Sequence, residues 1–181
     1  MKIVLLAATI AGLLAAQAPA PLSYVNEIKQ SYTGIKNNVL RSAEKMPEDK
    51  YTFKPSPNMP ETRDFAGEVA HAADIQTMLC SMALNAPKQG TAATKKTKAE
   101  LIAALQESNT LCDQAYASVT DANANEARPF IRGQRTLIGV LEFNVAHHNE
   151  TYGTMVPYLR MNNLVPPTSD NAGNAAKGKA K

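Results

Sequence analysis

The chain has 181 residues, of which 44% are hydrophobic and 19% are charged, and its formal net charge at pH 7 is +3. This length and composition predict one globular domain with a sizeable core. The basic residues are spread along the sequence, apart from a small group at Lys95, Lys96 and Lys98 that we expect in a solvated linker. Proteins that bind nucleic acids usually carry clustered basic residues, so we exclude that class.

Both ends of the chain differ in composition from the middle. Residues 1–20 start with a lysine after the initiator methionine, continue with a short apolar run from Ile3 to Ala16 and end in small residues, which is the pattern of a signal peptide. Residues 168–181 hold no large apolar side chain, so we expect a disordered tail there. The folded domain is therefore predicted over residues 21–167, in a protein that is periplasmic or secreted.

The first two predicted helices are separated by a proline-rich segment. Apolar residues recur every three or four positions from Ser23 to about Met46, which predicts a helix that Ser23 caps. Four prolines follow within residues 47–60, so that segment is expected to run extended across the surface. A second helix then begins at Thr62 or Asp64.

The third and fourth predicted helices complete a bundle. Thr97 and Glu100 have the spacing of a capping box, and the apolar residues that follow recur in alternating steps of four and three, as in a bundle seam. Residues 120–134 are expected to form a loop, and the fourth helix starts near Arg135 or Thr136. No stretch of any length alternates with a period of two. The predicted fold class is therefore all-α, with four helices and no strand.

All three histidines fall in predicted helices. His71 is expected on the inward side of the second helix. His147 shares a face of the fourth helix with Thr151, because residues four apart lie one above the other. His148 is turned by about 100° from His147, so the two rings cannot point at the same atom. We expect His148 at the surface or at a helix interface, and Glu150 in solvent.

A resemblance to a known family is carried by three segments, AEKMPEDKYTFKPSP, AGEVAHAADIQTMLC and VAHHNETYGTMVPYLRMNNLVPPTS. In these segments, which extend over nearly all of the predicted domain, the chain resembles the DinB/YfiT-like superfamily. The resemblance implies a four-helix bundle in up-down-down-up order, with parallel second and third helices. It also implies a divalent metal, zinc or nickel, held by one histidine of the second helix and an H-x-x-x-H pair of the fourth. Some members are metal-dependent thiol S-transferases or related hydrolases.

Carried over residue by residue, this metal site falls on His71, His147 and Thr151. His71 matches the second-helix histidine, and His147 matches the first histidine of the pair. Thr151 stands where the second histidine is expected, and catalytic sites usually need three protein ligands. Two interpretations stay open: a weakened metal site that water or substrate completes, and two buried histidines joined only to hydrogen-bond partners.

The two cysteines, Cys80 and Cys112, come level if the second and third helices run parallel as the resemblance implies. An exported chain permits a disulfide, and a bridge fits that arrangement. Two buried thiols in the core are the alternative. A reactive thiolate is disfavoured, because no basic residue lies near either cysteine in the sequence.

Three side chains near the end of the fourth helix, Tyr152, Tyr158 and Arg160, are candidates to line a cleft, although tyrosines there also pack with their hydroxyls at the rim.

The sequence is compatible with three functions. The first is an exported four-helix protein with a degenerate or weakened divalent-metal site. The second is an active metal-dependent thiol S-transferase or hydrolase that uses His71 and His147, and the third is a non-catalytic helical binding module. The expected partners are a small-molecule substrate and a second copy of the chain, with no nucleic acid and no membrane after processing.

Overall fold

The computed structural model describes residues 22–170. The predicted signal peptide and residues 171–181 of the predicted tail lie outside this part of the chain. The described part contains four long helices, α1 (Tyr24–Lys45), α2 (Phe65–Ala83), α3 (Lys98–Ser118) and α4 (Leu137–Met161), and two short 3-10 helices, η1 (Glu48–Lys50) and η2 (Ala92–Thr94). The prediction of an all-α four-helix bundle is confirmed. No helix between residues 22 and 170 is both long and apolar enough to cross a bilayer.

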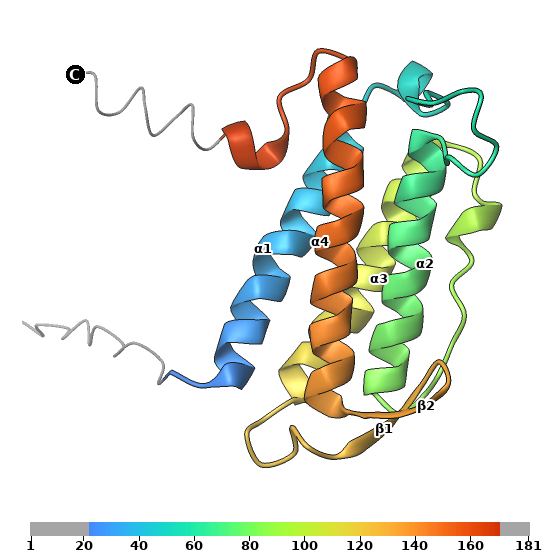
Figure 1. Cartoon of the computed structure of the whole chain (residues 1–181). Coiled ribbons are helices and arrows are strands. Elements are labelled where there is room, and N and C mark those ends of the chain that lie inside the picture. Colours follow the sequence, from blue (N-terminus) through green and yellow to red (C-terminus); the bar gives the residue numbers. More distant parts are fainter. Residues whose placement is uncertain (1–21, 171–181) are drawn as a thin grey trace, which may run out of the picture.

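The helices run in up-down-down-up order, with α1 and α4 in one direction and α2 and α3 in the other (Figure 1). α2 packs against both α3 and α4, and α1 packs mainly against α4. Because α2 and α3 are parallel, their connection has to return along the length of the bundle (Figure 1). Asp74 of α2 fixes this connection by accepting hydrogen bonds from Ala92 N at 2.6 Å and Ala93 N at 3.0 Å. A Cβ at Gly90 would collide with Asp74, so the close approach requires glycine.

Polar side chains fix the start of every long helix. Ser23, Asp64, Thr97 and Thr136 each accept a hydrogen bond from the backbone N–H three residues further on. Thr97 and Glu100 form the predicted capping box, and Asp64 rather than Thr62 caps α2. Loss of such a cap typically costs about 1 kcal/mol of stability.

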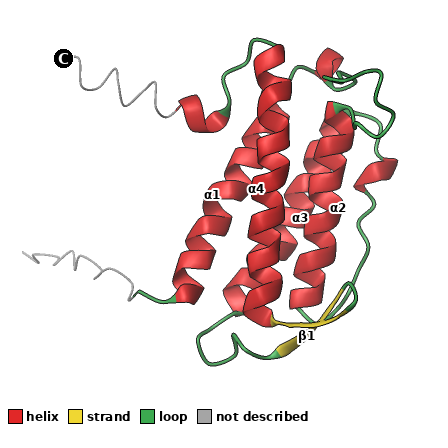
Figure 2. Cartoon of the chain, viewed as in Figure 1, coloured by secondary structure: helices red, strands yellow, loops and turns green. Residues whose placement is uncertain are grey.

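The segment between α3 and α4 is not the simple loop that we predicted. β1 (Ala127–Phe130) and β2 (Gly133–Thr136) pair antiparallel and lie across one end of the bundle (Figure 2). The prediction of no strand was wrong because each strand has only four residues and is largely exposed, so no alternation of apolar and polar residues marks it. The guanidinium of Arg135 lies 4.5 Å from the centre of the Phe130 ring and fixes the hairpin onto α4 through Phe143, at 5.1 Å.

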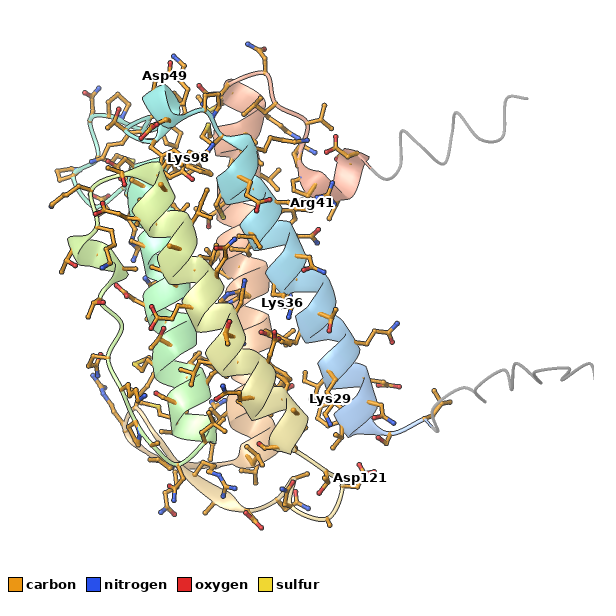
Figure 3. The ribbon with its side chains drawn as sticks, turned by 180° about the vertical axis from the view of Figure 1, so that it is seen from behind. Lys29, Lys36, Arg41, Asp49, Lys98 and Asp121 are labelled. Carbon is orange, nitrogen blue, oxygen red and sulfur yellow. A yellow bond between two sulfur atoms is a disulfide. The ribbon has the colours of Figure 1, made fainter. Side chains whose placement is uncertain are left out.

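Three lysines on the rear face join α1 to α3 (Figure 3). Lys36, in the middle of α1, forms an ion pair with Asp113 of α3. Lys29 donates to a backbone carbonyl just beyond the end of α3 at 2.8 Å, and Lys98 donates to Met46 O beyond the end of α1 at 2.7 Å. Carbonyls at helix C-termini lack intrahelical partners and carry partial negative charge, so cations are favourable there.

Cys80 of α2 and Cys112 of α3 are joined by a disulfide, and both residues are fully buried. Their Cα atoms lie 5.0 Å apart, within the usual range of about 4.4–6.8 Å. The parallel course of α2 and α3 is what brings the two residues to the same level.

The predicted tail has an ordered beginning. Residues 167–170 form one helical turn. Thr168 Oγ1 lies 2.8 Å from the hydroxyl oxygen of Tyr152, and Asp170 forms an ion pair with Lys45 of α1. Polar contacts hold this turn, so its lack of large apolar residues did not reveal it.

Candidate functional site

The candidate site lies where α2 and α4 pack side by side in opposite directions (Figure 1). His71 of α2 and His147 of α4 face each other across this seam. Their Nε2 atoms are 3.0 Å apart, and their ring planes are inclined by 58°. The structure therefore brings together the two histidines that the sequence singled out.

Both rings of the pair are uncharged near neutral pH. Burial, and then the positive charge of Arg63, lower the pKa of His71 to about 4. Burial is also the main cause that lowers the pKa of His147. One neutral imidazole donates its Nε2–H while the other accepts, so the two rings hold opposite tautomers. Neutral imidazoles are also the form that binds metals.

A cleft of about 290 Å³ opens beside the two rings. We call it the histidine cleft, and it is lined by His71, His147, Arg63, Glu68, Glu150, Thr151 and Thr154. Glu150 is exposed, as predicted, so its carboxylate lies at the mouth of the cleft. The cleft gives a small ligand access to both histidines.

Thr151 is the family position that departs from histidine. Its side chain is buried, and its hydroxyl donates to the carbonyl oxygen of His147, one turn earlier, at 2.9 Å. Within residues 22–170 no three His, Cys, Asp or Glu side chains group closely enough to hold a metal ion. Of the three ligand positions that the family resemblance implies, two are histidines, and the third is a threonine whose hydroxyl bonds to its own helix.

A two-histidine site is nevertheless compatible with one ion. Two nitrogens that each lie about 2.0–2.1 Å from zinc can be at most about 4.2 Å apart. The separation of 3.0 Å between His71 Nε2 and His147 Nε2 is within that limit. Water or a ligand would have to supply the remaining positions, because the described residues do not.

We predicted His148 either at the surface or at a helix interface, and the structure excludes the surface. Its side chain is fully buried on the core side of α4, and burial lowers its pKa to about 3. The ring is turned away from the His71–His147 contact, as the helix geometry requires. Neither ring nitrogen has a hydrogen-bond partner within the described part of the chain.

Glu68 is a site residue that the sequence analysis missed. It precedes His71 by three residues, so both lie on one face of α2, and it lines the histidine cleft while being only 4% exposed. Burial raises the pKa of its carboxyl, and Arg63 Nη1, 3.5 Å from Glu68 Oε1, opposes that rise. The spacing to His71 was the signal available in the sequence, but an acidic residue in the first turn of a helix also reads as a solvated charge.

The three predicted cleft residues near the end of α4 take other positions. The Tyr158 hydroxyl donates to the backbone oxygen of Arg63 at 2.7 Å, so Tyr158 fixes the main chain at the edge of the site. Tyr152 contacts Thr168, and Arg160 is exposed. The lining of the histidine cleft includes none of the three.

Comparisons with known proteins show to which family this chain belongs. The family model of the DinB superfamily matches residues 32–155. A search of curated proteins gives no match. Among solved structures, a DinB-like protein from Bacillus cereus is similar with a TM-score of 0.67 at 14% identity, over 78% of this chain and 95% of that one. A DinB-like protein from Bacillus subtilis is similar with a TM-score of 0.60 at 17% identity, over 77% of this chain and 94% of that one.

Identities this low establish a shared fold and carry no substrate or activity across. The family match extends over most of the chain and includes both converging histidines, His71 and His147. The chain therefore belongs to the DinB superfamily.

Proposed function

We propose that this protein is an exported member of the DinB superfamily whose histidine cleft holds a weakened divalent-metal site. The observation that carries the proposal is the approach of His71 Nε2 to His147 Nε2, 3.0 Å apart, with both rings neutral. In the metal-free protein the two rings share a hydrogen bond. A divalent ion such as zinc or nickel would take the place of that hydrogen bond: the donor ring would carry its proton on Nδ1 instead of Nε2, and the Nε2 lone pairs of both neutral rings would face the ion.

Thr151 supports the view that the site is weakened. Catalytic divalent sites usually have three protein ligands and an open position. Here the hydroxyl of Thr151 already donates to His147 O, and a neutral hydroxyl is a poorer ligand than imidazole. A metal held by two histidines and water is expected to exchange readily with solvent.

A second candidate function is metal-dependent transfer or hydrolysis, and Glu68 is the observation that favours it. A bound divalent ion lowers the pKa of a coordinated water or thiol and so supplies a nucleophile near neutral pH. Glu68 is a buried carboxyl in the same cleft with a raised pKa, which is typical of a group that accepts or donates protons in a reaction. Glu68→Gln would then abolish turnover and leave metal affinity nearly unchanged.

A third candidate function is a helical binding module that holds no metal.

Metal analysis of the purified protein separates these candidates. Under the leading proposal, dialysed protein retains less than one equivalent of metal, added zinc binds reversibly, and His71→Ala or His147→Ala abolishes that binding. One equivalent that survives dialysis and disappears in His71→Ala would favour the active enzyme over a weakened site. Zinc binding that is equally weak in the parent and in both variants would leave only the module without a metal.

Export is part of the same proposal. Residues 1–20 have the composition of a signal peptide, so the mature chain should begin between about residues 16 and 22. Intact-mass measurement on protein from the exported fraction tests this. An unprocessed N-terminus on a chain that stays in the cytoplasm would contradict it.

A further inference from the structure

A second hollow adjoins the histidine cleft on the other side of His71. Its volume is about 410 Å³, and it lies between the first half of α2 and the segment that leads into α3. We call it the side hollow, and the lining residues that matter below are Arg63, Asp64, His71, Asp74 and Lys95. Arg63 and His71 line both spaces, so the side hollow and the histidine cleft are neighbours.

The side hollow presents cationic donors that the protein uses little. The guanidinium of Arg63 is about half exposed (47%), and its only polar contact among residues 22–170 is the long one to Glu68, at 3.5 Å. The ammonium of Lys95 is exposed and forms no hydrogen bond or ion pair with any described residue. A guanidinium carries five N–H donors and an ammonium three, so most of this capacity is available to a ligand.

The two carboxylates that line the side hollow, by contrast, already accept hydrogen bonds from backbone N–H groups. Asp64 accepts from Gly67 N at 2.8 Å in the cap of α2. Asp74 accepts from Ala92 N and Ala93 N with its two oxygens. Glu100, whose charge also faces Lys95, accepts from the backbone in the cap of α3. A ligand that enters the side hollow therefore meets unused donors on Arg63 and Lys95, and two carboxylates that backbone hydrogen bonds hold in place.

The backbone that carries Arg63 is also held in place. Its carbonyl oxygen accepts the Tyr158 hydroxyl hydrogen bond at 2.7 Å. A Cβ added at Gly67 would lie 3.1 Å from the Arg63 Cβ, so the absence of a side chain at Gly67 lets Arg63 lie close over the first turn of α2. A cation whose main chain is fixed loses less entropy when it binds a ligand.

We propose that the side hollow binds an anionic oxygen group, a carboxylate or a phosphate, through Arg63 and Lys95. A guanidinium recognises such groups with two parallel hydrogen bonds, and a neighbouring ammonium adds a second positive charge. The ligand would carry this anionic group at one end and reach the histidine pair with the other. The inference extends the proposed function, on which it rests for the identity of the histidine end.

The test is calorimetric titration of the metal-free, full mature chain at low ionic strength, with inorganic phosphate and separately with succinate. The variants are Arg63→Gln and Lys95→Gln, with Lys96→Gln as the matched control, because Lys96 adjoins Lys95 but does not line the side hollow. We expect the parent to bind at least one probe, and the tighter probe identifies the phosphate or the carboxylate class. Arg63→Gln should raise that Kd about tenfold and Lys95→Gln about threefold, in line with the loss of charge-assisted hydrogen bonds. Lys96→Gln should leave it within experimental error.

Two results would overturn the anion site. Either the parent binds neither probe, or all three variants weaken binding equally, which would show attraction to net charge alone. Lys95 is exposed, so Lys95→Gln decides the question even if Arg63→Gln fails to fold.

Zinc titration of the same proteins keeps the anion-site proposal and the metal-site proposal apart. Anion binding that depends on Arg63 and Lys95 in a protein that binds no zinc would refute the metal site and leave the anion site standing, and the reverse pattern would do the opposite.

Discussion

α2 takes part in two seams of different chemistry. On the α3 side, Cys80 is bonded to Cys112, and Gln76 Nε2 donates to Asn109 Oδ1 at 2.7 Å between fully or nearly fully buried side chains. On the α4 side, His71 and His147 meet beside a cleft. One helix therefore contributes a covalent, closed contact on one side and an open, ionisable one on the other.

The ionisable groups of the α2–α4 seam indicate how the roles of the two seams differ. In the α2–α4 seam, burial lowers the pKa of His71 and raises the pKa of Glu68, so the folded protein holds both groups in surroundings that disfavour their charged forms. Such arrangements lower stability and are typical of sites that bind or react. We infer that the α2–α3 seam contributes stability and the α2–α4 seam contributes binding.

The largest expected effect comes from breaking the α2–α3 seam. Replacing both cysteines in Cys80→Ala/Cys112→Ala removes a cross-link between residues 32 apart. For a loop of that size the free energy of unfolding should fall by about 3–4 kcal/mol, measured by urea denaturation. Zinc affinity should stay unchanged, because the other seam is intact. Two reactive thiols in the oxidised, exported protein, titrated in denaturant without reductant, would contradict this account of the seam.

A smaller loss of stability tests the polar part of the same seam. Asn109→Ala removes the acceptor of the Gln76 amide and leaves that buried donor without its partner. The expected cost is about 1–3 kcal/mol. Asn149→Ala is the matched control, since Asn149 is exposed and bonds within its own helix, and it should change stability by no more than about 0.5 kcal/mol. Equal, small effects of both changes would remove Gln76–Asn109 from the stabilising contacts.

The third expected effect is a pH dependence that sharpens the description of the α2–α4 seam. The pKa of His71 is about 4 in the folded chain and 6.5 in its ordinary state. The unfolded chain therefore binds the proton more tightly, and the stability that neutral His71 provides is present above pH 6.5 and lost as the pH falls toward 4. In metal-free protein, His71→Gln should flatten the stability profile across this range. His147 and His148, whose pKa values burial also lowers, leave a remaining slope. Parallel profiles of the two proteins would show that His71 does not titrate in this way.

Much of the fold was accessible from sequence because it rests on local rules. Apolar spacing predicted the four helices, and the Thr97–Glu100 capping box is present as expected. The hairpin at 127–136 was missed, since its strands are too short and exposed to leave a pattern. The hairpin packs against α2 and α4, and no local signal in the sequence reports such contacts.

The candidate site also contains residues that the sequence predicted and residues that it did not. The likeness to a family placed His71 and His147, and the structure brings their rings together. The burial of His148 was readable, because it lies seven residues after Leu141 and seven before Met155 on the apolar stripe. Glu68 was not readable in that way, since its burial depends on how α4 covers the first turns of α2. Arg63 joins the two spaces through tertiary packing, which spacing along the chain does not encode.

The central claim is that the α2–α4 seam holds a metal site that Thr151 weakens. Thr151→His restores an imidazole one turn after His147, on the same face of α4. The most direct measurement is the melting temperature of parent and variant with and without added zinc, because a ligand that binds only the native state stabilises it. We predict that the melting temperature of Thr151→His rises with zinc while that of the parent moves little. A variant that folds normally and gains no zinc dependence, or a parent that shifts as much as the variant, would contradict the claim.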